Sequence, residues 1–88
     1  MKFFEWDKEK NDKLKKERGV GFEEIVIKII NKDVLDTISN PSRNFPNQKI
    51  LVVEINKYIY YIPYVENEKK VFLKTIIPSR KLTKKYQK

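Results

Sequence analysis

Three hydrophobic runs in the second half of the chain constrain its fold more than any other feature. They cover Lys49 to Ile55, Tyr58 to Val65 and Lys70 to Ile77, and only short turns separate them. Runs of this length rich in Val, Ile and Tyr are typical of β-strands, and short turns join strands that are antiparallel neighbours. We therefore predict an antiparallel meander with a tight turn at Asn56-Lys57. Pro63 indicates a bulge or an edge, because proline cannot donate a hydrogen bond to a neighbouring strand.

Two helical segments come before these runs and a third follows them. Asp7 is a favourable N-cap for a helix over residues 8–18, and Gly19 is placed to end it. A second helix is expected from about Phe22 to Asn31, because its apolar residues follow the spacing of a buried helical stripe. That stripe comprises Ile25, Val26, Ile29 and Ile30. A short helix from about Ser79 to Gln87, with Ser79 as its N-cap, is expected to end the chain.

This order of elements indicates an α+β fold made of a single domain over residues 1–88. We predict two layers, in which the two N-terminal helices pack on an antiparallel sheet of three to four strands. Residues 34–38 would supply the fourth strand, and residues 3–6 form either a short strand or an extended lead-in. Residues 39–47 are rich in Asn, Pro and Ser and are therefore expected to form an exposed loop.

The composition excludes several classes of site. The chain has no cysteine and no histidine, so it lacks thiolates, the commonest zinc ligand and the usual general base near neutral pH. It contains no nucleotide-binding glycine loop, and we expect neither a metal nor another cofactor. The apolar runs are too short to span a bilayer, and the first residues lack the apolar segment of a signal peptide. We therefore expect a cytoplasmic protein without membrane contacts.

The distribution of charge favours a polyanionic partner. The formal net charge is +8, yet basic and acidic residues are nearly balanced over residues 1–36, whereas residues 69–88 include only basic ones. A well-solvated surface would account for the charge alone. The asymmetry favours a localised surface that binds anions.

The last predicted strand brings a cation and an aromatic ring to one surface. Strand alternation places Phe72 and Lys74 together on the face away from the helices, which we call the open face. By the same rule Glu54 lies on the open face, while Arg80 and Lys81 follow the last strand at its rim. The candidate phosphate-binding and catalytic residues are therefore Lys74, Arg80, Lys81 and Glu54.

Cations interleaved with aromatic rings suit single-stranded RNA, whose bases stack on rings while Lys and Arg hold its phosphates. The N-terminus of the last helix would add backbone donors for one phosphate. The candidate RNA contacts are Tyr60, Tyr61, Phe72, Lys84, Lys85 and Tyr86. Structural roles compete with these assignments, because Tyr and Phe commonly pack within sheets and the terminal lysines would otherwise be a solvated tail. Glu54 would alternatively pair with a lysine across the strands.

Cleavage of RNA would need no metal, because the 2′-OH of the RNA can supply the nucleophile. Arg80 and Lys74 would then stabilise the charge that develops on the phosphate. Three kinds of group compete for the role of proton acceptor: a lysine whose pKa is lowered by neighbouring cations or burial, Glu54, or a tyrosine.

Nearly the whole chain resembles the BrnT toxins of type II toxin–antitoxin systems, which are related in fold to the RelE and ParE toxins. Phe4 to Asp7 (FEWD) is similar to the family's opening F-x-W-D, and Gly19 to Glu24 (GVGFEE) to its G-V-S-F-E-E. Ile76 to Thr83 (IIPSRKLT) is similar to its I-I-S-A-R-R-A-T, and between these motifs the first helix carries Asn11 and Lys15 or Lys16. The family's lysine-histidine pair before the glycine is replaced by Glu17-Arg18.

The resemblance implies a RelE-like fold and an endoribonuclease that inhibits translation. It also implies neutralisation by a cognate antitoxin, usually a small ribbon-helix-helix DNA-binding protein. Arg80 and Lys81 match the family's basic pair, although a lysine at the second position loses the bidentate fork of an arginine. Thr83 matches its threonine, and Lys74 lies where the family has a basic residue. Two alternatives stay open: a non-catalytic module that binds RNA or the antitoxin, and a ParE-like inhibitor of gyrase.

Overall fold

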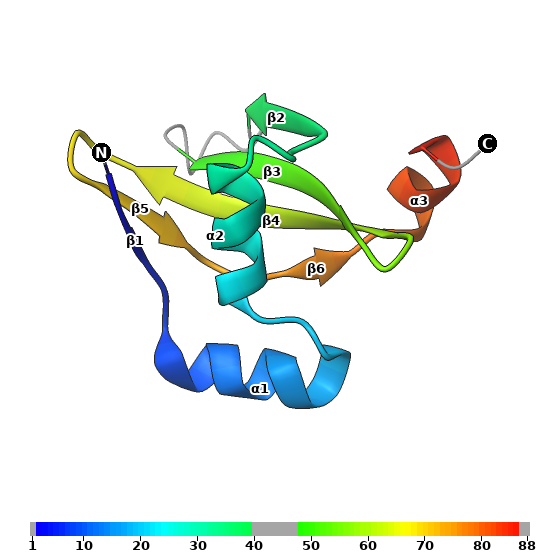
Figure 1. Ribbon diagram of the computed structural model, residues 1–88, viewed down its shortest axis with the longest axis horizontal. Coiled ribbons are helices and arrows are strands. Elements are labelled where there is room, and N and C mark those ends of the chain that lie inside the picture. Colours follow the sequence, from blue (N-terminus) through cyan, green and yellow to red (C-terminus); the bar gives the residue numbers. More distant parts are fainter. Residues whose placement is uncertain (1, 40–47, 87–88) are drawn as a thin grey trace.

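The computed structural model describes residues 2–39 and 48–86, without the side chain of Tyr86. Within these ranges the chain forms three helices and six strands (Figure 1). The helices are α1 (Lys8–Arg18), α2 (Phe22–Ile30) and α3 (Arg80–Tyr86), and the strands are β1 (Phe3–Glu5), β2 (Asp36–Ser39), β3 (Gln48–Ile55), β4 (Tyr58–Glu66), β5 (Lys70–Leu73) and β6 (Ile77–Pro78). The fold class is α+β, as predicted. Most of the predicted loop and Gln87 lie outside the described residues.

The strands form one mixed sheet in the order β1-β5-β4-β3-β2, with β6 paired to β4 beyond the end of β5. β1 runs parallel to β5, and its Phe3 lies opposite Lys70. The prediction of a purely antiparallel sheet with three to four strands was therefore wrong in both respects. For residues 3–6 the sequence allows a strand or an extended lead-in, and residues 3–5 form the strand β1. Their partner is more than sixty positions away, and three residues carry no pattern that reveals it.

The predicted strand from Lys70 to Ile77 is divided into β5 and β6, and Pro63 explains the division. The Lys74 amide donates to the Pro63 carbonyl at 2.9 Å, so the missing N–H of Pro63 faces the same neighbouring segment. The strand pairing with β4 is interrupted there and resumes where Ile77 pairs with Tyr61. Two residues lie between Lys74 and Ile77, whereas one lies between their partners Pro63 and Tyr61 on β4, which makes this a β-bulge. The bulge turns Ile76, rather than Ile77, into the core.

The core lies between α1, α2 and one face of the sheet. Leu14 from α1 and Phe22 and Ile25 from α2 cluster with alternate residues of three strands. Those strand residues are Leu51, Val53, Ile55, Ile62, Tyr64, Val71 and Leu73. The predicted stripe of α2 holds for Ile25, Val26 and Ile29, but Ile30 is exposed. Among the described residues, no helix is long and apolar enough to cross a membrane.

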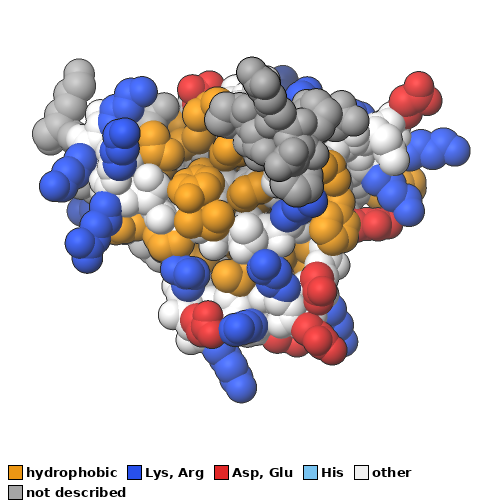
Figure 2. Space-filling model, turned by 180° about the vertical axis from the view of Figure 1, so that it is seen from behind, with side chains coloured by type: hydrophobic (Ala, Val, Ile, Leu, Met, Phe, Trp, Pro, Cys, Tyr) orange, Lys and Arg blue, Asp and Glu red, His pale blue; other side chains and the backbone are white. Residues whose placement is uncertain are grey.

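The open face of the sheet carries apolar side chains that remain in contact with solvent (Figure 2). Cross-strand pairing places Phe72 opposite Val65 and Ile38 opposite Ile50 on this face. Phe3 of the edge strand β1 is 72% exposed, and Ile38 and Phe72 are also exposed. The sheet therefore buries one face against helices and leaves large apolar side chains accessible on the other.

A polar network joins α1 to the start of α2. The buried amide of Phe22 donates to Asn11 Oδ1 at 2.8 Å, and Asn11 Nδ2 donates to Glu23 Oε1 at 2.9 Å. Lys15 Nζ binds the other oxygen of Glu23 at 2.7 Å. A Cβ on Gly21 would lie 2.5 Å from Lys15 Cε and 2.7 Å from Glu23 Oε1, so glycine leaves the space that the network occupies. Asn11, Gly21 and Glu23 thus have structural roles where α1 meets α2.

The network makes the stability of the protein dependent on Glu23 ionisation. Hydrogen bonds from Lys15 and then Asn11 lower the pKa of the Glu23 carboxyl from 4.5 to about 2. Because the folded state holds its proton less tightly than the unfolded chain, this stabilisation is complete above the unfolded pKa. It is lost as the pH falls from about 4.5 towards about 2. We expect Glu23→Gln to flatten the acid limb of a plot of unfolding free energy against pH.

Urea titrations followed by the fluorescence of Trp6 would measure this plot, since Trp6 stacks on Phe22 with ring centroids 5.9 Å apart. Glu24→Gln is the matched control, because it removes the same charge from the next position of α2. We expect Glu24→Gln to keep the wild-type slope. If the unfolding free energy of Glu23→Gln falls with pH as steeply as that of the wild type, Glu23 ionisation does not stabilise the fold.

Candidate nucleic-acid interface

The helix α3 is fixed to the start of β4 by two residues of its first turns. The Ser79 amide donates to the carbonyl of Ile59 at 2.9 Å, and the Ile59 amide donates to Thr83 Oγ1 at 2.9 Å. The same hydroxyl donates to the Ser79 carbonyl at 2.7 Å, and Thr83 is buried. Ser79 and Thr83 together occupy both backbone groups of Ile59, as a neighbouring strand would. The orientation of α3 relative to the sheet is therefore set by hydrogen bonds to the backbone of Ile59.

This attachment presents a row of cations at one end of the molecule. Arg80, Lys81, Lys84 and Lys85 are all exposed, and the helix holds no acidic residue. Within the described ranges, no acidic group contacts Arg80, Lys81 or Lys84. Figure 2 shows basic and no acidic side chains at its left, where α3 lies. Close unbalanced cations produce a positive potential that attracts a polyanion.

The residues predicted to be catalytic surround this end of β4 without forming one tight cluster. Lys74 and Ser79 bond to Pro63 and Ile59, which are four residues apart, so their backbones are separated by about 13 Å along the strand. Glu54 pairs with Ile59 from the other side, so it lies two strand spacings, or about 10 Å, from Ser79. Within the described chain, no hydrogen bond or ion pair joins Glu54 to Arg80.

The aromatic residues predicted to bind RNA are divided between the two faces. Tyr61 and Phe72 lie on the open face, as the register with Val52 and Val65 requires. Tyr60 lies on the other face, where it packs against the core, so it does not share the open face with Tyr61. The reason is the period of two along a strand, which separates adjacent tyrosines. The side chain of Tyr86 lies outside the described part of the chain.

The N-terminus of α3 uses part of its backbone donors within the protein, and their predicted contact with a phosphate stays a prediction. Ser79 is its N-cap, as predicted, and Ser79 Oγ accepts the amide of Leu82 at 3.2 Å. The amide of Thr83 donates to the Ser79 carbonyl at 3.0 Å. The cap therefore uses these amides within the protein. Among the described residues, no hydrogen bond occupies the amides of Arg80 and Lys81, so these amides and the basic side chains remain for an anion.

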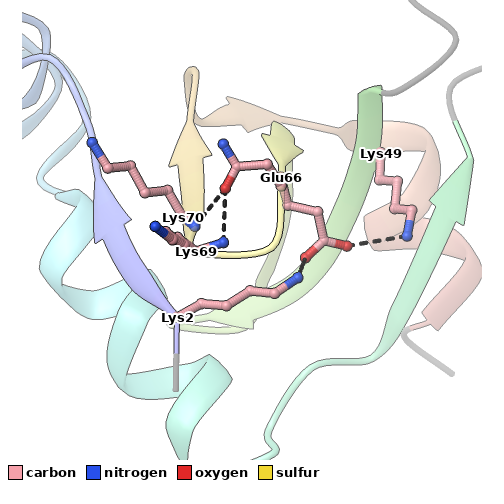
Figure 3. Close-up of polar contacts among 6 residues, drawn as sticks. Lys2, Lys49, Glu66, Lys69 and Lys70 are labelled. Atoms are coloured by element: carbon pink, nitrogen blue, oxygen red, sulfur yellow. Dashed lines mark hydrogen bonds and ion pairs between the residues drawn. The ribbon is translucent and has the colours of Figure 1, made fainter.

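A second group of lysines lies at the opposite end of the sheet, around the turn between β4 and β5 (Figure 3). Glu66 accepts hydrogen bonds from Lys2 at 2.7 Å and Lys49 at 3.1 Å, and Lys70 pairs with Glu5 at 3.1 Å. The bonds from Lys2 and Lys49 lower the pKa of the Glu66 carboxyl. Carboxylates thus balance much of the positive charge at this end. The end that carries α3 is the better anion-binding surface.

A cleft near α3 was missed by the sequence-based assignment. Its lining residues are Glu17, Arg18, Tyr58, Tyr60 and Pro78. Tyr58 and Tyr60 share a face because they are two positions apart, and their ring centroids lie 5.6 Å apart. The alternation of tyrosines in β4 was the available signal. Nothing in the sequence indicated that the end of α1 would lie beside them.

Comparison with known proteins gives no family assignment. No protein-family model matches the chain, and neither a curated protein nor a solved structure matches it. The resemblance to the BrnT toxins therefore remains a hypothesis, and function has to be inferred from the residues of this chain.

Proposed function

We propose that this protein is a toxin of the BrnT type, a metal-independent endoribonuclease that binds RNA at the end of the sheet carrying α3. The observation that carries the proposal is the set of exposed cations on a helix anchored by Thr83. Arg80, Lys81 and Lys84 have no acidic partner in the described chain. Their charge is therefore available to phosphates. The order of motifs in the sequence supports the same family and, with it, a two-layer RelE-like fold.

In the proposed reaction the 2′-OH of the RNA attacks the adjacent phosphate. Arg80 stabilises the charge on the phosphorane, and Lys81 binds a neighbouring phosphate. Glu54 faces the start of β4 from β3 and accepts the proton of the 2′-OH. Lys74, which follows β5 and bonds to Pro63 further along β4, holds the RNA backbone. The leaving 5′ oxygen takes its proton from Lys81 or from water. The protein thus aligns the RNA and stabilises the phosphorane, while the RNA supplies the nucleophile.

The experiment combines expression in cells with cleavage of purified RNA in the presence of EDTA. We expect the wild type to arrest growth and to produce fragments, and Arg80→Ala to lose both activities while keeping its circular dichroism spectrum and melting temperature. Removing an electrostatic contact to a transition state costs about a hundredfold or more in rate. Cleavage by a correctly folded Arg80→Ala protein at the wild-type rate would contradict the proposal.

A second candidate is a non-catalytic module that pairs with an antitoxin. The exposed apolar residues Phe3, Ile38 and Phe72 on the open face favour it, because large apolar side chains gathered on one face mark protein interaction sites. The purified protein would then bind RNA or a ribbon-helix-helix partner but release no fragments. RNA binding without cleavage at any enzyme concentration would select this candidate.

A further inference from the structure

We propose that the cleft between the end of α1 and the start of β4 binds one unstacked RNA base. This inference rests on the proposed RNA-binding function and assigns it a second, chemically distinct subsite. The cleft is formed by Tyr58 and Tyr60 of β4, Pro78 of β6, and Glu17 and Arg18 of α1. These five residues come from three elements that the core and the sheet hold in place.

The walls of the cleft are firmly positioned. Tyr60 pairs with Pro78 across β4 and β6, so the ring and the pyrrolidine lie side by side on the helix-covered face. Tyr58 and Tyr60 are tilted by 58° with their ring centroids 5.6 Å apart. Both tyrosines are half-buried, so part of each side chain remains accessible. Two tyrosines held in this way offer stacking surface that does not have to be ordered when a ligand binds.

The polar residues at the rim select a base rather than a phosphate. Glu17 carries a carboxylate, which repels phosphate but accepts hydrogen bonds from the amino groups of a base. Arg18 is exposed in the last turn of α1, where its planar guanidinium can stack on a base or bind its acceptor atoms. A site with two tyrosines, one cation and one carboxylate therefore suits a base that presents an amino group, such as cytosine or guanine.

The cleft and the basic helix are placed to bind one RNA strand together. Pro78 in the wall of the cleft is followed by Ser79, the N-cap of α3, and then by Arg80. A base in the cleft would therefore leave its phosphate close to the cations of α3. This arrangement separates the two tasks of RNA recognition: phosphates are held on α3, and a base is read in the cleft.

The test compares Tyr58→Leu with Tyr58→Phe in binding to labelled single-stranded RNA and to an abasic strand of the same length. We expect Tyr58→Leu to weaken binding of the RNA by roughly fivefold to a hundredfold, the range measured for loss of one stacked base. It should leave binding of the abasic strand unchanged. Tyr58→Phe keeps the ring and should bind both strands as the wild type does. Melting temperatures confirm that each variant is folded.

The outcomes separate this inference from the proposed function. If Tyr58→Leu binds RNA as the wild type does while Arg80→Ala binds it weakly, the base subsite is wrong and the proposed RNA function stands. Equal weakening for RNA and for the abasic strand also overturns the subsite, because that loss is structural. If the wild type binds no RNA, both proposals fail. Should Tyr58→Leu not fold, Arg18→Gln, an exposed substitution, must show the same selective loss for the subsite to stand.

Discussion

Replacing Arg80 and Lys81 together by glutamine is expected to weaken binding to single-stranded RNA by at least about tenfold at moderate salt. Each phosphate neutralised by a protein cation releases counterions, so affinity for a single strand falls with salt at a slope of about 0.7 per contact. Loss of two contacts should therefore reduce the slope of log K against log salt by about 1.4. Neither side chain contacts an acid within the described residues, so the fold should lose little stability.

The matched control is the pair Lys69→Gln and Lys70→Gln at the turn between β4 and β5. It removes the same total charge from exposed positions at the other end of β4. We expect this control to retain the wild-type salt slope and to lose only the small, general attraction that comes from net charge. If both pairs reduce the slope equally, RNA binding is a diffuse property of a basic protein and α3 has no special role.

Asn11→Ala is expected to lower the free energy of unfolding by about 3 kcal/mol. Asn11 is only 4% exposed, and it satisfies the amide of Phe22, itself fully buried. Alanine leaves that donor without a partner and removes a charge-assisted hydrogen bond to Glu23. Phe22 and Ile25 of α2 belong to the hydrophobic core. Loss of the hydrogen bonds that join α1 to the start of α2 therefore affects the packing of both helices.

Urea denaturation followed by Trp6 fluorescence provides the measurement. Asp12→Ala is the control, since it truncates an exposed polar residue at the next position of α1 and should change stability by less than about 0.5 kcal/mol. Similar free energies of unfolding for the two variants would show that the network contributes little to stability. The stabilising role assigned to Asn11 would then be wrong.

Local patterns predicted the elements of this fold well. Asp7 caps α1 through its side chain, Gly19 ends it with a φ of 70°, and the turn at Asn56-Lys57 has positive φ at both residues. Each depends on neighbours within a few positions. The parallel pairing of β1 with β5 was not predictable in this way, because it joins segments at opposite ends of the chain. Pro63 indicated a bulge, but not which side chains would exchange faces beyond it.

The site was predictable only where strand alternation governs it. Alternation placed Glu54 and Phe72 on the open face, as the register shows. It also separates Tyr60 from Tyr61, because adjacent strand residues point to opposite faces, and Tyr60 packs against the core. The structural role of Thr83 depends on contact with Ile59, which is 24 positions away. Arg18 reaches Tyr58 and Tyr60 only through the packing of α1 against the sheet.

Chemical-shift mapping of the backbone amides during titration with single-stranded RNA tests the central claim most directly. The account predicts that the largest changes fall on residues 57–61 and 78–86, at the end of the sheet that carries α3 and the cleft. The turn from Glu66 to Lys70, where Glu66 balances Lys2 and Lys49, should change little. Chemical-shift changes centred on that turn, or no changes at saturating RNA, would contradict RNA binding at the end that carries α3.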